Sequence, residues 1–283
     1  MNAQRLFLAA LPVACSFSIL AAAQQSATTD PQAAQADAET HTAHVDARAD
    51  ARVKAMSDYL AKLQSFSFTV DIMYDAVEDD GQKLQLGRVS AVEIRRPQYL
   101  RAESKGDRGV HQISVFDGKN FIVHDATQKV FSRIEANGAL PELFATLFEK
   151  YGVSPPLVDF LLPDVHAALT ENANSGGILG DATVAGKECE HLTFSGDSID
   201  WQVWIEKGDH PFPRKFVITY KDVDVRPQFI AVFREWNGSA SHADSRFVTT
   251  PPADAREVPM DVPAAQSRTE SADDKKNNDQ QGD

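Results

Sequence analysis

From Ser65 to Tyr74 the chain alternates between large apolar side chains and mostly polar ones. Phe66, Phe68, Val70 and Ile72 occupy one set of alternate positions. Since successive side chains of a strand point to opposite faces, this pattern predicts a strand with one buried face. Asp79-Asp80-Gly81 follows and is typical of a tight hairpin turn.

Similar short runs recur along the chain with turn residues between them. They predict strands at 83–95, 98–103, 110–116, 120–124 and 129–134, and again at 183–184, 189–194, 200–206, 212–220 and 228–236. Short connections between consecutive strands favour an antiparallel sheet over a parallel one. We therefore expect about 11 strands in one antiparallel sheet, counted over these runs.

Helical periodicity interrupts the strands twice. Val53, Met56, Leu60 and Leu63 predict an opening helix. Between the two groups of strands, apolar residues recur at helical spacing from Leu140 to Tyr151, with Pro141 in the first turn and Gly152 at the end. Segments 157–162 and 165–169 predict two shorter helical pieces, and we expect the glycines at 176–180 to form a flexible exit from this block.

This order of elements predicts an α+β fold. A sheet of this length curls because its strands twist, and helices that do not separate parallel strands must cover one face. We expect a strongly curved antiparallel sheet, an incomplete β-barrel, whose concave face is covered by the N-terminal helix and the mid-chain helical block.

The N-terminus carries an export signal. Arg5 precedes an apolar run that ends in Ala21-Ala22-Ala23, which predicts a signal peptide at 1–23 and a periplasmic location. A transmembrane anchor fits less well, because the run is short and Pro12 interrupts it. A lipid anchor on Cys15 is a second alternative, although the apolar run continues beyond that cysteine.

Two segments lack the apolar side chains that a folded core requires. We interpret 24–50 as a flexible leader and 252–283 as a disordered acidic tail, which leaves one folded domain at 51–251. These ends hold five acidic residues against one arginine, and eight against four basic ones, so they account for much of the net charge of −13. No basic segment of the sequence indicates a nucleic-acid partner.

The sequence contains few motifs that indicate catalysis or metal binding. The histidines are scattered without metal-ligand spacing, and no Gly-x-Ser-x-Gly motif occurs. Cys189 is the only cysteine beyond the signal peptide, and we expect it to be a small buried side chain. We predict no enzyme activity, no metal and no cofactor.

The strongest candidate for a functional site is the apolar surface predicted on the first strand and the mid-chain helix. We expect one face of the first strand and one face of the mid-chain helix to meet across an apolar space, formed by Phe66, Phe68, Val70, Ile72, Leu143, Phe144, Leu147 and Phe148. One hypothesis makes this space a cavity for a hydrophobic ligand. The alternative is a core that these side chains simply fill.

Several motifs resemble one known family. They are residues 201–221, Met56-Ser-Asp-Tyr-Leu60, Ser65-Phe-Ser-Phe68, Arg95-Arg-Pro97 and Tyr151-Gly-Val153, and they resemble the uncharacterised predicted periplasmic proteins of domain of unknown function 2092. More distantly, Val203-Trp-Ile-Glu206 followed by Pro211-Phe-Pro213 is similar to the periplasmic lipoprotein carriers of the LolA and LolB type. The lipoprotein-handling arginine of those carriers has no matching position here. The resemblance implies the fold, the compartment and an apolar ligand.

Two functions of different classes follow. One is a non-enzymatic carrier or sensor of a hydrophobic, lipid-like ligand. The other is an interaction or regulatory module of the cell envelope, with a protein partner, a filled core and no ligand. An open apolar cavity would favour the first, and an exposed apolar patch over a packed interior would favour the second.

The signal peptide yields a direct prediction. Cleavage after Ala23 removes 23 of the 283 residues and leaves 260. The intact mass of the exported protein should match that product. A mass that includes an acylated N-terminal cysteine would establish the lipid anchor at Cys15 instead.

Overall fold

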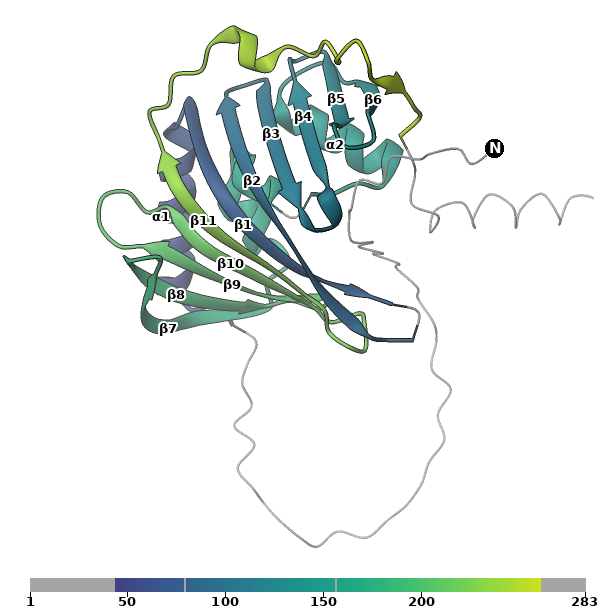
Figure 1. The fold of residues 1–283 in the computed structure, drawn as a ribbon. Coiled ribbons are helices and arrows are strands. Elements are labelled where there is room, and N and C mark those ends of the chain that lie inside the picture. Colours follow the sequence, from purple (N-terminus) through teal and green to yellow (C-terminus); the bar gives the residue numbers. More distant parts are fainter. Residues whose placement is uncertain (1–43, 79, 156, 261–283) are drawn as a thin grey trace, which may run out of the picture.

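The computed structural model describes residues 44–78, 80–155 and 157–260. They form one curved sheet of 12 strands in the order β12-β6-β5-β4-β3-β2-β1-β11-β10-β9-β8-β7 (Figure 1). The strands before the helical block are β1 (Ser65–Val77), β2 (Lys83–Arg95), β3 (Tyr99–Gly106), β4 (His111–Phe116), β5 (Asn120–Asp125) and β6 (Val130–Glu135). Those after it are β7 (Ser175–Val184), β8 (Lys187–Ser195), β9 (Ile199–Glu206), β10 (Pro213–Tyr220), β11 (Gln228–Asn237) and β12 (Arg256–Glu257).

The two groups of strands are joined by one long-range pairing. β1 pairs antiparallel with β2 on one side and with β11 on the other. The first six strands extend in sequence order from this junction, and β11 to β7 extend from it in reverse order. All neighbouring strands are antiparallel except β12 and β6, which are parallel. The sheet is open, with β12 and β7 at its edges.

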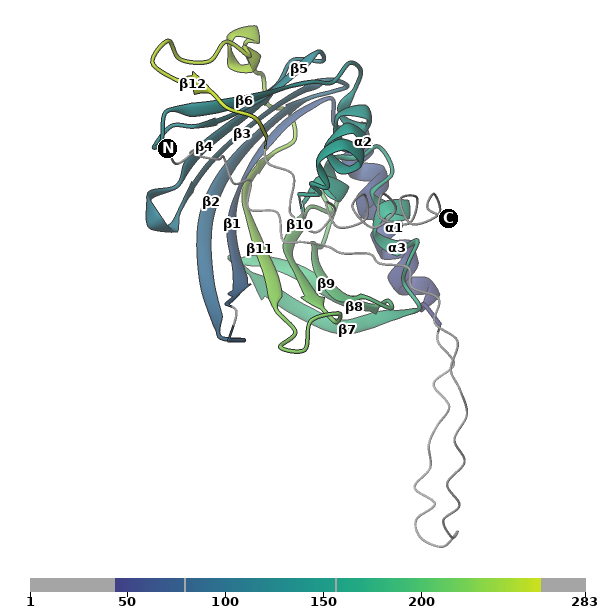
Figure 2. The same cartoon turned by 90° about the vertical axis from the view of Figure 1, so that its right-hand side faces the viewer.

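The helices lie on the concave side of the sheet (Figure 2). They are α1 (Ala47–Lys62), α2 (Leu140–Tyr151) and α3 (Val165–Thr170), with short 3-10 turns η1 (Asp107–Gly109), η2 (Val158–Leu161) and η3 (Asp244–Phe247). The expected fold class, a curved open antiparallel sheet with helices over its concave face, is confirmed.

Capping interactions explain where α1 begins and where α2 ends. The Asp46 side chain accepts hydrogen bonds from the backbone N–H groups of Arg48 and Ala49, which satisfies two free donors at the start of α1. At the C-terminal end of α2, Gly152 adopts a left-handed conformation (φ 61°). This conformation suits glycine because it has no Cβ, and it stops the helix.

The structured region extends beyond the predicted limits of 51 and 251. α1 begins at Ala47, inside the segment interpreted as a leader, and β12 lies inside the segment interpreted as a disordered tail. Val258, just after β12, is buried at 5% exposure, so the apolar side chains of this stretch do contribute to the core. The predicted signal peptide and the remainder of both terminal segments lie outside the described residues.

The glycines at 176–180 belong to a strand, so the expectation of a flexible exit is wrong. A Cβ at Gly176 would lie 2.3 Å from the ring of Phe194 on the neighbouring strand β8. Phe194 in turn stacks on Trp201 at a centroid distance of 4.0 Å. The glycine is therefore needed for close approach of a ring, which a sequence pattern alone does not distinguish from flexibility.

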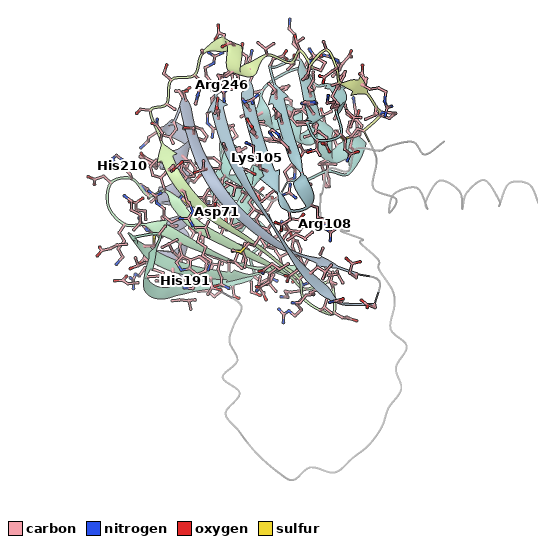
Figure 3. All side chains as sticks on the ribbon, viewed as in Figure 1. Asp71, Lys105, Arg108, His191, His210 and Arg246 are labelled. Carbon is pink, nitrogen blue, oxygen red and sulfur yellow. The ribbon has the colours of Figure 1, made fainter. Side chains whose placement is uncertain are left out.

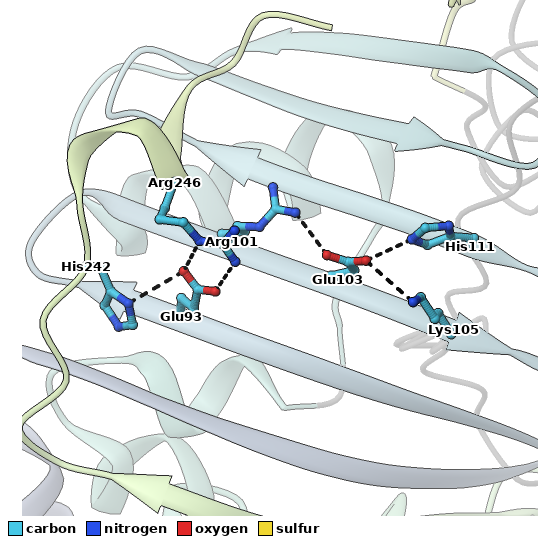
Figure 4. A network of polar contacts seen from close by, with 7 residues as sticks. All are labelled: Glu93, Arg101, Glu103, Lys105, His111, His242 and Arg246. Atoms are coloured by element: carbon cyan, nitrogen blue, oxygen red, sulfur yellow. Dashed lines mark hydrogen bonds and ion pairs between the residues drawn. The ribbon is translucent and has the colours of Figure 1, made fainter. Parts of the chain in front are cut away.

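Residues 238–260, which we call the C-terminal strap, run along the top of the sheet from β11 to the β6 edge (Figure 1). Arg246 donates two hydrogen bonds to the Glu93 carboxylate on β2, and His242 also approaches that carboxylate (Figure 4). The hydrogen bonds from Arg246 lower the pKa of the Glu93 carboxyl. Figure 3 looks onto this outer face, where Asp71, Lys105 and Arg246 project away from the helices.

Phe247 of the strap packs its ring against the outside of the sheet, beside Tyr99 and the Arg95 guanidinium. Its side chain is 2% exposed and contacts the Tyr99 ring at a centroid distance of 5.4 Å.

None of the described helices is both long and apolar enough to cross a membrane.

The strap should contribute measurably to stability. Phe247→Ala empties a buried site and is expected to lower the free energy of unfolding by about 3 kcal/mol. The control is Phe148→Ala on α2, where the side chain is 56% exposed, and the change should stay within about 0.5 kcal/mol. Urea denaturation measures both. Equal losses would show that the strap does not pack on the sheet.

Candidate functional site

A cavity of about 200 Å³ lies between the concave face of the sheet and the helical block. Its floor is built from β1 to β5 and β11, and its cover from α2 and the segment that follows it. Apolar floor residues include Val70, Ile72, Val92, Leu100, Phe121 and Phe229. The apolar side chains of the cover are Phe144, Leu147, Val153, Pro155, Leu157, Val158 and Leu161.

Four of the eight predicted side chains line this cavity. Val70 and Ile72 come from β1, and Phe144 and Leu147 come from α2. Strand alternation places the first two on the concave face, and helical spacing places the other two on the face of α2 turned toward it. The structure thus brings one part of each predicted face to the same space.

The other part of the β1 face is packed. Phe68 contacts Trp236 at a centroid distance of 4.4 Å, and Phe66 lies against the same indole at 6.1 Å. Phe212 stacks on Trp236 from another side at 4.7 Å. The indole N–H donates to the Pro213 carbonyl, so its one polar group is satisfied. Phe66 and Phe68 therefore belong to a filled aromatic core instead of the cavity.

The helix face is also divided. Leu143 is fully buried but does not line the cavity, and Phe148 is 56% exposed. At 3.6 residues per turn, Phe148 lies roughly 100° around α2 from the centre of its buried leucines. The placement of Phe148 in the cavity is therefore wrong, because the helix turns that margin of its apolar stripe toward solvent.

The cavity wall also has a polar part that the apolar periodicities did not indicate. Arg88, Ser90, Ser104, Gln112 and Ser114 line it from β2, β3 and β4. The Ser90 and Ser104 hydroxyls are 2.7 Å apart and share a hydrogen bond. A signal for two of them existed in the sequence, since positions 88 and 90 alternate in step with the buried Val92 and Ile94.

Arg96 fastens the cover of the cavity to the sheet. Its Nη1 donates to the Leu161 carbonyl at 2.9 Å, and its Nη2 approaches the Leu162 carbonyl at 3.4 Å. The guanidinium lies 5.6 Å from the centre of the Phe66 ring, and burial lowers the pKa of Arg96. η2 is further anchored by Phe160, whose ring meets Phe216 edge-on at 5.0 Å.

Asp159 places a carboxyl group in this cover. It lies on η2 between Val158 and Leu161, both of which line the cavity. Burial raises the pKa of Asp159 to about 6. Burial, and secondarily the charge of Asp159, raises the pKa of Tyr220 on β10 to about 12. The cover thus carries a group that titrates near neutral pH.

Metal-binding and thiol chemistry find little support in the described ranges. No group of three or more His, Cys, Asp or Glu residues there is arranged to hold a metal ion. Cys189 is a buried free thiol, as expected, and burial raises its pKa. Such a thiol is less reactive because the thiolate is the nucleophile.

Comparison with known proteins places the chain in a family. The family model described as "Predicted periplasmic protein (DUF2092)" matches residues 49–261. The chain belongs to this family. No curated protein matches the sequence.

Among solved structures, the chain is similar to the lipoprotein LppX of Mycobacterium tuberculosis, with 14% identity, a TM-score of 0.46 and coverage of 70% of this chain and 100% of that one. It is also similar to the MucA/MucB complex structure of Pseudomonas aeruginosa, with 14% identity, a TM-score of 0.41 and coverage of 75% and 64%. A third is a putative outer membrane lipoprotein-sorting protein domain of Vibrio parahaemolyticus, with 8% identity, a TM-score of 0.32 and coverage of 70% and 97%.

The buried carboxyl of Asp159 should make stability depend on pH. Its folded pKa of about 6 exceeds its ordinary value of 3.8, so the folded protein binds the proton more tightly between these values. Stability should therefore fall as pH rises through this range. Asp159→Asn should be more stable than wild type near about pH 7.5, and this advantage should shrink below about pH 4.

Urea denaturation at both pH values measures the effect. Asp224→Asn, at an exposed carboxyl after β10, is the control and should match wild type. If Asp159→Asn is more stable than wild type by the same amount at both pH values, the raised pKa of Asp159 is contradicted, because the gain in stability would then not depend on ionisation of the carboxyl.

Proposed function

We propose that this protein is a non-enzymatic periplasmic carrier or sensor of a hydrophobic, lipid-like ligand. The observation that carries the proposal is the mostly apolar cavity of about 200 Å³ between the concave face of the sheet and the α2–η2 cover. The family description as predicted periplasmic proteins agrees with that compartment.

The size of the cavity supports ligand binding. Protein interiors are normally packed as densely as organic crystals, so a space of this volume leaves its wall without many dispersion contacts. A dry apolar cavity of about 150 Å³ is enough to bind benzene. Pockets for drug-sized ligands are commonly about 300–1,000 Å³. The present cavity therefore suits one slender apolar group, such as part of a single acyl chain.

The cover supplies a route for uptake. Between Gly152 and Leu162, the described residues contribute five apolar side chains to the cavity, and the four residues of η2 are the regular structure among them. Arg96 and Phe160 are its main anchors to the sheet. Entry of a ligand would require this segment to move away from the sheet and expose side chains that are now buried, Val153 and Phe160 among them.

The packed aromatic core around Trp236 favours the second function, an interaction or regulatory module of the envelope with a protein partner. In that function the interior is a core throughout and no ligand is taken up. A probe that reports on the cavity separates the two functions.

Enlarging Phe144 should block uptake. In Phe144→Trp the indole would occupy open volume, so binding of the neutral fluorophore phenylnaphthylamine should fall at least about tenfold while stability changes little. Phe148→Trp is the matched control, because that side chain is one turn further along α2, is 56% exposed and does not line the cavity. Fluorescence titration and urea denaturation measure both variants.

The opposite result is equally specific. If the space is a filled core, wild-type protein should not bind the fluorophore, and Phe144→Trp should lose about 1–3 kcal/mol of stability through overpacking. That combination would overturn the carrier function in favour of the interaction module.

A further inference from the structure

One part of the cavity wall is not explained by an apolar ligand alone. β2, β3 and β4 present polar side chains to a space whose other walls are apolar. Along β2 the same face changes from Ile94 and Val92 to Ser90 and then Arg88. The change from apolar to charged side chains occurs within one strand, so the cavity has two chemically different ends.

The strand register places these polar residues together. Ser90 lies opposite Val70 on one side and Ser104 on the other, and Ser104 lies opposite Gln112. Arg88 is the next residue on this face of β2 and lies opposite Ile72. The hydroxyls of Ser90 and Ser104 bond to each other. Within the described residues, no hydrogen bond to the Gln112 side chain is formed.

Arg88 provides a positive charge that the described part of the chain does not neutralise. No carboxylate among the described residues lies within 4.0 Å of its guanidinium, and its guanidinium carbon lies 5.1 Å from the centre of the Tyr74 ring. Removing a charge from water costs free energy unless a partner restores its interactions. A half-buried arginine on the wall of a cavity is therefore suited to an anionic partner.

We infer that the ligand is a single-chain fatty acid, whose carboxylate binds Arg88 and whose chain occupies the apolar end of the cavity. This inference rests on the proposed function and specifies its ligand class. Arg88, Ser104 and Gln112 are half-buried, whereas Val70 and Leu147 are fully buried. The head group therefore lies at the more accessible end and the chain points toward α2.

Charge and volume select this class over other lipids. Arg88 is the only cationic side chain lining the cavity in the described chain, which matches a head group of one negative charge. Its planar guanidinium can donate two parallel hydrogen bonds to a carboxylate. A volume of about 200 Å³ does not accommodate the two chains of a phospholipid. A neutral lipid would leave the charge of Arg88 uncompensated.

The test compares dodecanoate with methyl dodecanoate as competitors of phenylnaphthylamine, at about pH 8, where a carboxylic acid is ionised. Wild-type protein should bind dodecanoate at least about tenfold more tightly, because charge-assisted hydrogen bonds exceed neutral ones. Arg88→Gln should lose this preference and still bind the methyl ester. Arg88→Lys, which retains the charge, should keep part of it.

Arg133→Gln is the matched control. Arg133 also lies on a strand near an aromatic ring, with its guanidinium carbon 6.0 Å from the centre of the Phe131 ring, but it is exposed and does not line the cavity. This variant should keep the full preference for dodecanoate. Circular dichroism melting curves establish that all variants are folded.

Different results would overturn the fatty-acid inference and the carrier function. Equal binding of acid and ester by wild type, with no effect of Arg88→Gln, would overturn the fatty-acid inference and leave the carrier function standing. If wild type binds neither phenylnaphthylamine nor either competitor, the proposed function fails together with the inference.

Discussion

The pairing of β1 with β11 holds the two halves of this fold together. Strands β1 to β6 form one antiparallel meander and β7 to β11 form another, and the pairing of β1 with β11 joins them into one sheet. β1 has 13 residues and pairs with β2 along its whole length, while β11 binds its other edge from Ser67 to Tyr74. With both edges paired, β1 becomes the centre of the sheet, and its concave face becomes the centre of the interior.

Along that central strand the interior changes character. At its start, Phe66 and Phe68 meet Trp236, and large flat rings fill the space between sheet and helices. Further along, Val70 and Ile72 have smaller side chains, and their neighbours on β2 are Ser90 and Arg88. Smaller and more polar side chains cannot fill the same gap, so the cavity begins where the aromatic rings end. Core and cavity are thus two parts of one surface.

The electrostatics of the cavity cover follow from its position. Arg96 is half-buried without an ion pair in the described residues, and its hydrogen bonds go to backbone carbonyls of the cover. Asp159 lies in the same segment, and burial makes its ionised form unfavourable near neutral pH. Arg96 therefore holds the cover to the sheet, whereas ionisation of Asp159 opposes the burial of the same segment.

The sequence alone determined most of the elements and their layers. Alternation from Ser65 to Tyr74, helical spacing from Leu140 to Tyr151 and turn residues between strands are local patterns, and local backbone geometry converts them directly into strands, helices and hairpins. The antiparallel curved sheet followed from the short connections. Motifs along residues 51–251 also indicated the family that the family model confirms.

Tertiary structure decided what the local patterns leave open. The rotation of α2 sends Phe144 into the cavity and Phe148 to the surface, although both belong to one apolar stripe. Gly176 is required by a ring on the next strand, Arg256 and Glu257 pair with β6, and Val258 is buried in the core. Each outcome depends on the volume and charge of side chains that are distant in sequence. Periodicity fixes which face a residue is on, and only packing fixes whether the space before that face is filled or open.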